Sequence, residues 1–233
     1  MRVGGIILCG GKSSRMGLSK VTLPFGPEQM LHRVLRLLGE VVQPLVVVAA
    51  PHQQLPDLPP EVLVARDRRE DRGPLEGLYA GLQMLRERVD AAYATSCDVP
   101  LLVPAFVRRE LELIEEHAVV VPVEGQFHHP LAAVYRAGVL PHLETLLNAD
   151  RLRPIFLYDA VDTLRVPVEQ FRSVDPQLHT LANLNRPADY FAALRAAGYE
   201  PPEETVRALT GTSQADGKEY NTKLLTSLGG AAR

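Results

Sequence analysis

The sequence is poor in three features, and each deficit excludes a class of protein. It has two cysteines, Cys9 and Cys97, without the close spacing of a metal or redox pair, so we expect reduced thiols and a cytoplasmic protein. No apolar run approaches the roughly 20 residues that a membrane-spanning helix needs, and no signal-peptide pattern is present. The net charge of -3 lacks the positive surplus typical of broad nucleic-acid binding. We therefore expect neither a membrane nor nucleic acid as a partner, and any anion site must be local.

Length and composition fit one globular domain with a short appendage. The chain has 233 residues, of which 46% are hydrophobic and 23% are charged, and no internal repeat is found. After Pro201-Pro202 the composition turns polar, with Gly, Thr, Ser and Lys. We expect a domain over residues 1–200 and, over 201–233, a tail of unknown role that is partly helical and partly mobile.

Strand and helix signals alternate through the first half of the chain. Strand-like apolar runs cover 3–8, 45–50, 62–65 and 91–96, and helical spacing covers 31–38 and 75–89. Such repeated units predict an α/β fold, a three-layer αβα sandwich around a mostly parallel, Rossmann-like sheet. Ligands would then bind at the carboxyl ends of the strands.

The second half is less regular. Two strands at 119–123 and 131–135 should form a hairpin, and helices are expected at 140–147 and 154–158. A last short strand is predicted at 178–184, and a closing helix at 188–197.

The first strand ends at a glycine pair that opens a cationic loop. Gly10-Gly11 is followed within nine residues by Lys12, Arg15 and Lys20. Glycines let backbone N–H groups approach a phosphate, and the cations neutralise its charge. The glycine spacing fits neither the P-loop nor the dinucleotide-binding fingerprint. The pattern therefore favours an anion-binding loop of another type over an ordinary strand-to-helix turn.

Residues 8–20 resemble the signature L-x-G-G-x-S-x-R-M-G-x-D-K of the molybdenum cofactor guanylyltransferases, which share the nucleotide-diphospho-sugar transferase fold. Further family motifs match at 73–77 (G-P-L-x-G), 97–100 (C-D-x-P), 129–130 (H-P) and 183–189 (N-x-N-x-P-x-D). The resemblance covers roughly residues 1–197. Two positions depart from it: Ser19 stands where the family usually has aspartate, and Ala49 where it has asparagine.

The resemblance implies a set of site residues. Those expected to bind the nucleotide are Leu8, Cys9, Gly10, Gly11, Lys20, Asp67 and Asp98. Those expected to be catalytic are Arg15, Lys20 and Asp98, with Asp98 also the ligand of Mg²⁺. Those expected to bind the acceptor substrate are His129, Asn183 and Asn185.

The chemistry of the two carboxylates agrees with these roles without requiring them. Asp98 ends a predicted strand, where it could bind Mg²⁺ beside phosphates or equally cap the helix after Val103; only the resemblance favours the metal. Asp67 could accept hydrogen bonds from guanine N1 and its exocyclic amine, or from ribose hydroxyls. Cys97 is expected to be a packed residue rather than a nucleophile.

The acceptor side is less determined by sequence. Adjacent His128 and His129 point in different directions on a strand and make a poor metal pair, so only His129 is assigned to the substrate. Asp189 is expected to cap a helix. Either Arg151 or Arg153 could reach a substrate phosphate, and spacing does not choose between them.

The family's reaction transfers GMP from GTP to the terminal phosphate of molybdopterin, with Mg²⁺ as cofactor. By resemblance we expect this activity, with GTP and molybdopterin as substrates and molybdoenzyme-maturation proteins as possible partners. Three alternatives stay open. They are a CTP-using or other small-molecule nucleotidyltransferase, a non-catalytic nucleotide or cofactor carrier, and a module whose function lies in the tail.

Overall fold

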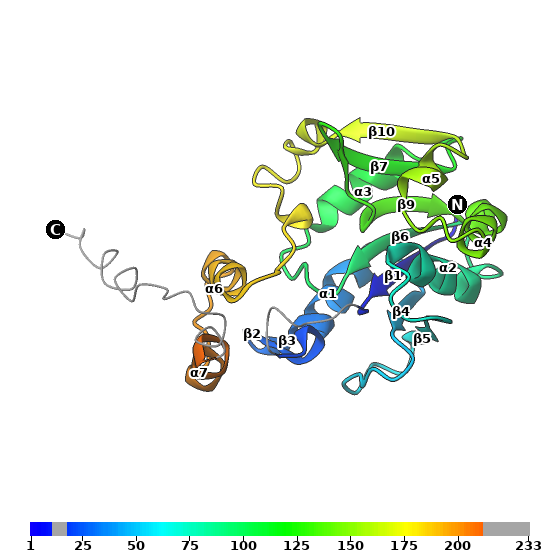
Figure 1. Cartoon of the computed structure of the whole chain (residues 1–233). Helices are drawn as coiled ribbons and strands as arrows, with labels where there is room; N and C mark the ends of the chain where they lie inside the picture. The colour runs from blue at the N-terminus through cyan, green and yellow to red at the C-terminus, as the bar shows by residue number, and fades with distance from the viewer. Residues whose placement is uncertain (11–17, 212–233) are drawn as a thin grey trace.

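A computed structural model describes residues 1–10 and 18–211 of the chain. Within these ranges a mixed sheet is enclosed between helices (Figure 1). The strands are β1 (Val3–Leu8), β2 (Pro24–Phe25), β3 (Glu28–Gln29), β4 (Leu45–Ala49), β5 (Leu63–Arg66), β6 (Ala91–Ser96), β7 (Val119–Glu124), β8 (Phe127–His128), β9 (Ala132–Arg136) and β10 (Thr163–Pro167). The α-helices are α1 (Met30–Gly39), α2 (Pro74–Leu85), α3 (Pro104–Glu112), α4 (Leu140–Asn148), α5 (Ile155–Tyr158), α6 (Pro187–Ala196) and α7 (Glu203–Gly211).

The main sheet has the strand order β10-β7-β9-β6-β1-β4-β5, and β8 pairs with β7 beside this path. Strands β4, β5 and β6 run parallel with β1, and β10 runs parallel with β7. In this sheet, as far as the structure describes it, only β9 and β8 pair in the antiparallel sense; β2 and β3 form a separate antiparallel pair. The prediction of a mostly parallel sheet is therefore confirmed, and the carboxyl ends of β1, β4, β5 and β6 meet at one edge.

Alternating side chains of the central strands fill two separate cores. Ile6 and Leu8 of β1 face a cluster built with α2, α4 and α5, whereas Ile7 faces a cluster built with α1 and α3. All three are buried, because a parallel strand covered on both faces has no solvent side. This is the three-layer αβα sandwich that the sequence predicts.

A third, smaller cluster lies beside the sandwich. It joins the β2–β3 hairpin to α6 and α7 through Phe25, Tyr190 and Leu209, each fully buried. The Tyr190 hydroxyl donates a hydrogen bond to the Pro24 carbonyl. Part of the segment expected to be a tail, α7, therefore packs on the rest of the chain, while residues 212–233 lie outside the described ranges.

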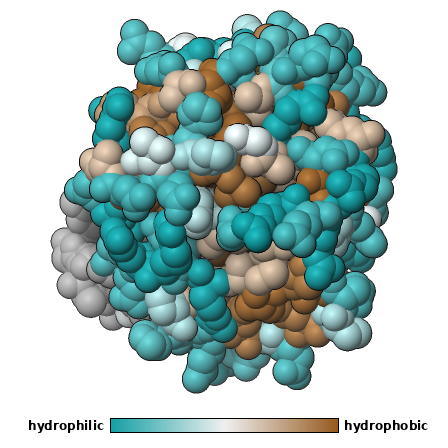
Figure 2. Space-filling model, turned by 90° about the vertical axis from the view of Figure 1, so that its right-hand side faces the viewer, coloured by the Kyte–Doolittle hydropathy of each residue, from teal (hydrophilic) through white to brown (hydrophobic). Residues whose placement is uncertain are grey.

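Figure 2 shows the face of the molecule over α2, α4 and β5. Hydrophilic residues predominate there, with smaller apolar patches between them. Val64 and Met84 are among the large apolar residues of β5 and α2 that remain partly exposed. No helix within the described ranges is both long enough and apolar enough to cross a membrane.

The second half departs from prediction in three places. The predicted strand at 178–184 is wrong: the chain forms a short 3₁₀ helix, His179–Leu181, because the Asp175 carboxylate accepts the N–H groups of His179 and Thr180 that a strand would need. Strand β10 was not predicted. The expected hairpin is present as antiparallel β7 and β9, but the turn at Gly125 joins β7 to the short β8.

Candidate functional site

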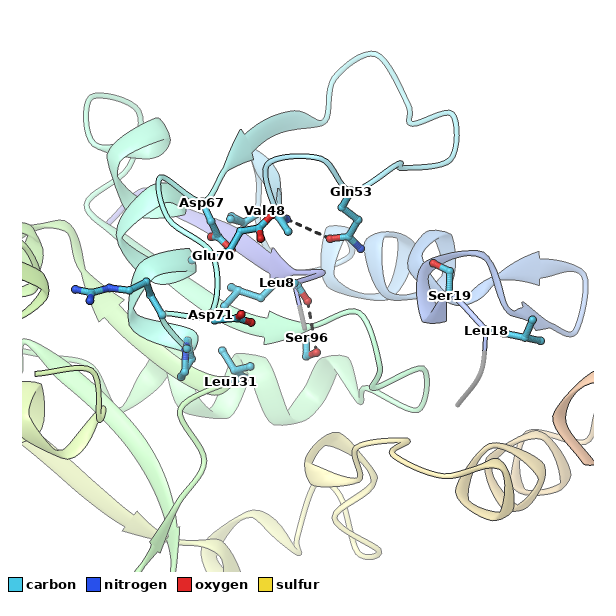
Figure 3. Close-up of a pocket in the computed structure, with 16 residues that line it drawn as sticks. Leu8, Leu18, Ser19, Val48, Gln53, Asp67, Glu70, Asp71, Ser96 and Leu131 are labelled. Carbon is cyan, nitrogen blue, oxygen red and sulfur yellow. Dashed lines mark hydrogen bonds between the residues drawn. The ribbon is translucent and has the colours of Figure 1, made fainter. Parts of the chain in front are cut away.

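The carboxyl ends of β1, β4, β5 and β6 surround a cavity of about 960 Å³ (Figure 3). Its walls come from the strand ends, the residues before Lys20 and the start of α2. The lining residues include Leu8, Gly10, Leu18, Ser19, Val48, Ala50, Gln53, Asp67, Glu70, Gly73, Gly77, Ser96 and Leu131. We call it the first cavity. Its place at the strand ends is where parallel α/β sheets bind ligands.

Lys20 and Asp98 form an ion pair at this edge of the sheet. Lys20 begins a 3₁₀ helix, Lys20–Thr22, and Asp98 follows β6 by two residues. The Lys20 Nζ donates to Asp98 Oδ2 at 2.7 Å and to Asn185 Oδ1 at 3.3 Å. The backbone adds a further link, since Leu184 N–H donates to the Asp98 carbonyl at 3.0 Å. Three segments far apart in sequence thus converge on one charged cluster.

The Asp98 carboxylate has an oxygen to spare. Asp98 is 7% exposed, and its Oδ1 is buried with no hydrogen-bond partner among the residues described. Asp98 does not cap the following helix, where Val103 N–H instead donates to the Thr180 hydroxyl at 3.1 Å. The carboxylate and the Asn185 amide oxygen are hard donors suited to a divalent cation. No group of three or more His, Cys, Asp or Glu that could hold a metal occurs in these ranges.

Asp67 lines the first cavity and stands directly after β5. Its Oδ1 is buried without a hydrogen-bond partner in the described structure. Burial, and then the nearby Glu76 carboxylate, raise the pKa of Asp67 to about 6. Such a group can change its protonation near neutral pH, and its free oxygen can accept a hydrogen bond from a ligand.

Two glycines bring backbone close to this carboxylate. A Cβ at Gly10 would lie 3.3 Å from Asp67 Oδ2. A Cβ at Gly77 in α2 would lie 2.8 Å from Leu8 Cδ2 and 3.4 Å from Asp67 Oδ1. Because glycine has no side chain, α2 can approach β1 at Gly77, and the Gly10 backbone can lie close to the Asp67 carboxylate.

A second cavity of about 640 Å³ adjoins the first, and Pro74 and Leu131 line both. All three residues predicted for the acceptor substrate line it: His129, Asn183 and Asn185. Arg153 lines it as well, whereas the Arg151 guanidinium stacks 4.1 Å from the centre of the Phe156 ring.

The two histidines differ less than the sequence suggested. His128 lines the second cavity too, and Arg165 Nε donates to its Nε2 at 3.3 Å. The His129 Nε2 is buried without a partner in the described part of the chain, and burial lowers the pKa of His129. A neutral imidazole with a free nitrogen is able to contact a ligand.

The remaining predicted positions fall as follows. Gly11 and Arg15 lie outside the described residues. Cys9 is buried, and a hydrogen bond with the Cys97 thiol, together with burial, raises the pKa of Cys9, so the thiol is neutral. Asp189 caps α6, because its Oδ2 accepts the N–H groups of Asn185 and Arg186 at 3.0 and 2.8 Å.

Gln53 is one of the lining residues that sequence reasoning missed. It stands four residues after β4 in a loop that matches no motif, so only its contacts reveal it. Ser96 was also missed as a lining residue, because a small polar residue ending a strand carries no signal of its own.

Comparison with known proteins assigns the chain to a family. The family described as "MobA-like NTP transferase domain" matches residues 5–163. The chain is 35% identical over 190 residues to a "probable molybdenum cofactor guanylyltransferase" of Mycobacterium tuberculosis (strain ATCC 25618 / H37Rv), covering 78% of this chain and 92% of that protein.

Solved structures show the same fold. The molybdopterin-guanine dinucleotide biosynthesis protein A of Archaeoglobus fulgidus superposes with a TM-score of 0.67 at 20% identity, covering 85% of this chain and 99% of that one. A protein of Mycobacterium tuberculosis H37Rv in complex with manganese gives a TM-score of 0.53 at 14% identity, covering 76% and 100%. The chain described here therefore belongs to the MobA-like NTP transferase family and is a nucleotidyltransferase.

Proposed function

We propose that this protein transfers GMP from GTP to the terminal phosphate of molybdopterin, releasing pyrophosphate. The observation that carries the proposal is the meeting of two cavities beside one charged cluster. Pro74 and Leu131 line both cavities, and Asn185 lines the second while it accepts a hydrogen bond from Lys20. A donor nucleotide in one cavity and an acceptor in the other would bring their phosphates together there.

The nucleotide base is placed toward Gly10 and Asp67 in the first cavity. An ionised Asp67 carboxylate can accept hydrogen bonds from guanine N1–H and the exocyclic amine, a pair of donors that cytosine lacks. The relatives named as guanylyltransferases support the same choice of nucleotide.

The chain's own residues would act by positioning and by neutralising charge. Lys20 is already held at the junction by Asp98 and Asn185, so its ammonium group can stabilise the negative charge that develops on the phosphates. The acceptor is an anionic phosphate, so no protein nucleophile or strong general base is needed. Mg²⁺, when held by the free oxygen of Asp98 and the substrate phosphates, would supply further charge neutralisation.

The test is a side-by-side assay of the purified protein with GTP or CTP, with and without molybdopterin and Mg²⁺. We expect pyrophosphate release that requires GTP, the acceptor and the metal together. Preferred turnover of CTP would replace the guanylyl assignment with a cytidylyl one. Nucleotide binding without pyrophosphate release would favour a carrier over an enzyme.

A further inference from the structure

Gln53 forms a bridge between two strand ends of the first cavity. Its Nε2 donates to the Cys9 carbonyl at 2.9 Å, just past β1, and its Oε1 accepts from the Ala50 N–H at 3.2 Å, just past β4. Figure 3 shows the side chain reaching back to the end of β4 and marks the second of these bonds. Because a carbonyl can only accept and an N–H can only donate, the two partners leave the amide one orientation.

The turn that carries Gln53 is itself held in place. The Gln53 N–H donates to the Ala50 carbonyl at 3.1 Å, which closes the turn 50–53. From the end of β5, the Arg66 guanidinium donates to the carbonyls of Ala50 and Gln53 at 2.9 and 2.6 Å. Contacts from the ends of β4 and β5 thus fix the turn that carries Gln53. The Gln53 side chain in turn holds the backbone just after β1.

The bridged carbonyl belongs to the residue before Gly10. Cys9 is buried, and its N–H still pairs with the Val48 carbonyl at 2.7 Å, but its carbonyl lies where the chain leaves the sheet. A buried carbonyl without a donor is unfavourable, so the Gln53 amide determines which way the backbone turns into Gly10. Gly10 in turn lies beside Asp67 in the lining of the cavity, where a Cβ on Gly10 would be 3.3 Å from Asp67 Oδ2.

We propose that Gln53 is a positioning residue for nucleotide recognition: it holds the Cys9–Gly10 backbone beside Asp67, so that Gly10 and Asp67 together form the surface against which the base binds. The assignment rests on the proposed function, in that the first cavity takes the nucleotide. The proposal also accounts for the loss of the family's asparagine, which is replaced here by Ala49. Ala49 is buried in β4 and presents no amide to the cavity. In this chain an amide four residues later reaches the same edge of the sheet.

The test uses two substitutions and a matched control in the full-length protein. Gln53→Ala removes both bonds. Gln53→Glu keeps an acceptor for the Ala50 N–H but sets a carboxylate oxygen against the Cys9 carbonyl. Gln54→Ala makes the same truncation at the exposed neighbouring residue, outside the bridge.

We expect both Gln53 variants to raise the KM for GTP by about tenfold and to change kcat by less than about threefold, because the base is bound equally in the ground and transition states. The GTP-induced rise in Tm should shrink, and the Tm without nucleotide should fall by a few degrees, because the Cys9 carbonyl loses its donor. Gln54→Ala should leave every value unchanged.

Two outcomes would overturn the assignment. One is an unchanged KM in both Gln53 variants, and the other is an equal loss in Gln54→Ala. A fall in Tm without any change in KM would show a purely structural bridge and would count against it too. Failure of the unsubstituted protein to bind GTP would instead reject the proposed function, which separates the two conclusions.

Discussion

At the scale of single residues, the site depends on polar atoms that the folded chain leaves without partners. Asp98 Oδ1 and Asp67 Oδ1 are both buried and unpaired within the described structure; Asp67 lines the first cavity, and Asp98 belongs to the charged cluster with Lys20. Buried polar atoms without a partner are costly, so they are expected where a ligand supplies the missing bond. This is the physical reason to place a cation at one and a base at the other.

Substitution at the Lys20–Asp98 pair should abolish catalysis without unfolding the protein. We expect Lys20→Ala and Asp98→Asn each to lower kcat at least about 100-fold, because the first removes a cation that neutralises phosphate charge and the second removes the carboxylate proposed to hold Mg²⁺ and Lys20. Thr22→Ala is the control, since among the residues described its exposed hydroxyl bonds only the Ser19 carbonyl on the same turn. Steady-state kinetics with circular dichroism would check this, and near-normal turnover in Lys20→Ala would contradict the assignment.

Asp67 should make GTP binding depend on pH. With a pKa of about 6, only about a tenth of the carboxyl is ionised at pH 5, so the affinity of the free protein for GTP should fall as pH drops below 6. Titrations of the unsubstituted protein and of Asp67→Asn across pH 5–8 would cancel the ionisation of the nucleotide itself. A constant ratio of the two affinities would rule out this role.

The raised pKa of Asp67 has the opposite effect on folding stability, which should fall as pH rises. A carboxyl whose pKa is raised by folding favours the folded state below its ordinary pKa, and that contribution is lost as pH rises through about 6. In the absence of nucleotide, Asp67→Asn should therefore raise the Tm more at pH 8 than at pH 5. The ligand-free protein thus bears a cost at Asp67 that bound guanine would relieve.

At the scale of elements, the approach of α2 to β1 shapes the first cavity. A Cβ at Gly81 would lie 2.6 Å from Ile6 Cγ2, and Ile6 is fully buried in the middle of β1. Gly77, one turn earlier, meets Leu8 and Asp67 in the same way. Two glycines on one helix face therefore set both the packing of the core and the width of the site.

Gly81→Ala should destabilise the protein although alanine is the better helix former. We expect a loss of about 1–3 kcal/mol from overpacking against Ile6, which exceeds the gain of at most about 1 kcal/mol in helix propensity. Gly138→Ala is the control, because no atom lies within 4 Å of its added Cβ. Chemical denaturation would measure both, and a stabilised Gly81→Ala would show that α2 can move away from β1.

At the scale of the whole molecule, the cluster of Phe25, Tyr190 and Leu209 joins α7 to the segment that carries Lys20. Leu23, directly after the Lys20–Thr22 helix, belongs to the same cluster. The position of Lys20 thus depends on packing supplied from the far end of the described chain.

Removal of residues 201–233 should lower stability and weaken catalysis together. Leu209→Ala alone should cost about 2–5 kcal/mol, because it leaves a cavity in this cluster. Arg207→Ala on the exposed side of α7 is the control, since its surface ion pair with Glu203 contributes little. Thermal unfolding and turnover of the three variants would test this, and an undiminished Tm in the truncated protein would show that α7 is dispensable.

Much of this architecture could be predicted from local pattern. The alternation of strand and helix through residues 3–96 predicted the layers, because buried parallel strands and amphipathic helices have distinct periods. The local pattern could not predict the 3₁₀ helix that replaces the expected strand at 178–184, because hydrogen bonds to the side chain of Asp175 decide the conformation there. Strand β10 was missed because it is a short edge strand whose partner β7 is distant in sequence.

The amino-acid sequence by itself determined which chemical groups are present and which strand ends carry them. The glycine pair, Lys20, Asp67 and Asp98 are local features that motifs describe. Only the tertiary structure decided which groups meet: Asn185 reaches Lys20 across 165 residues, and the two cavities share a wall at Pro74 and Leu131. Gln53 illustrates the physical reason. Its two hydrogen bonds depend on the distance between the ends of β1 and β4, and that distance is set by the pairing of the two strands in the sheet.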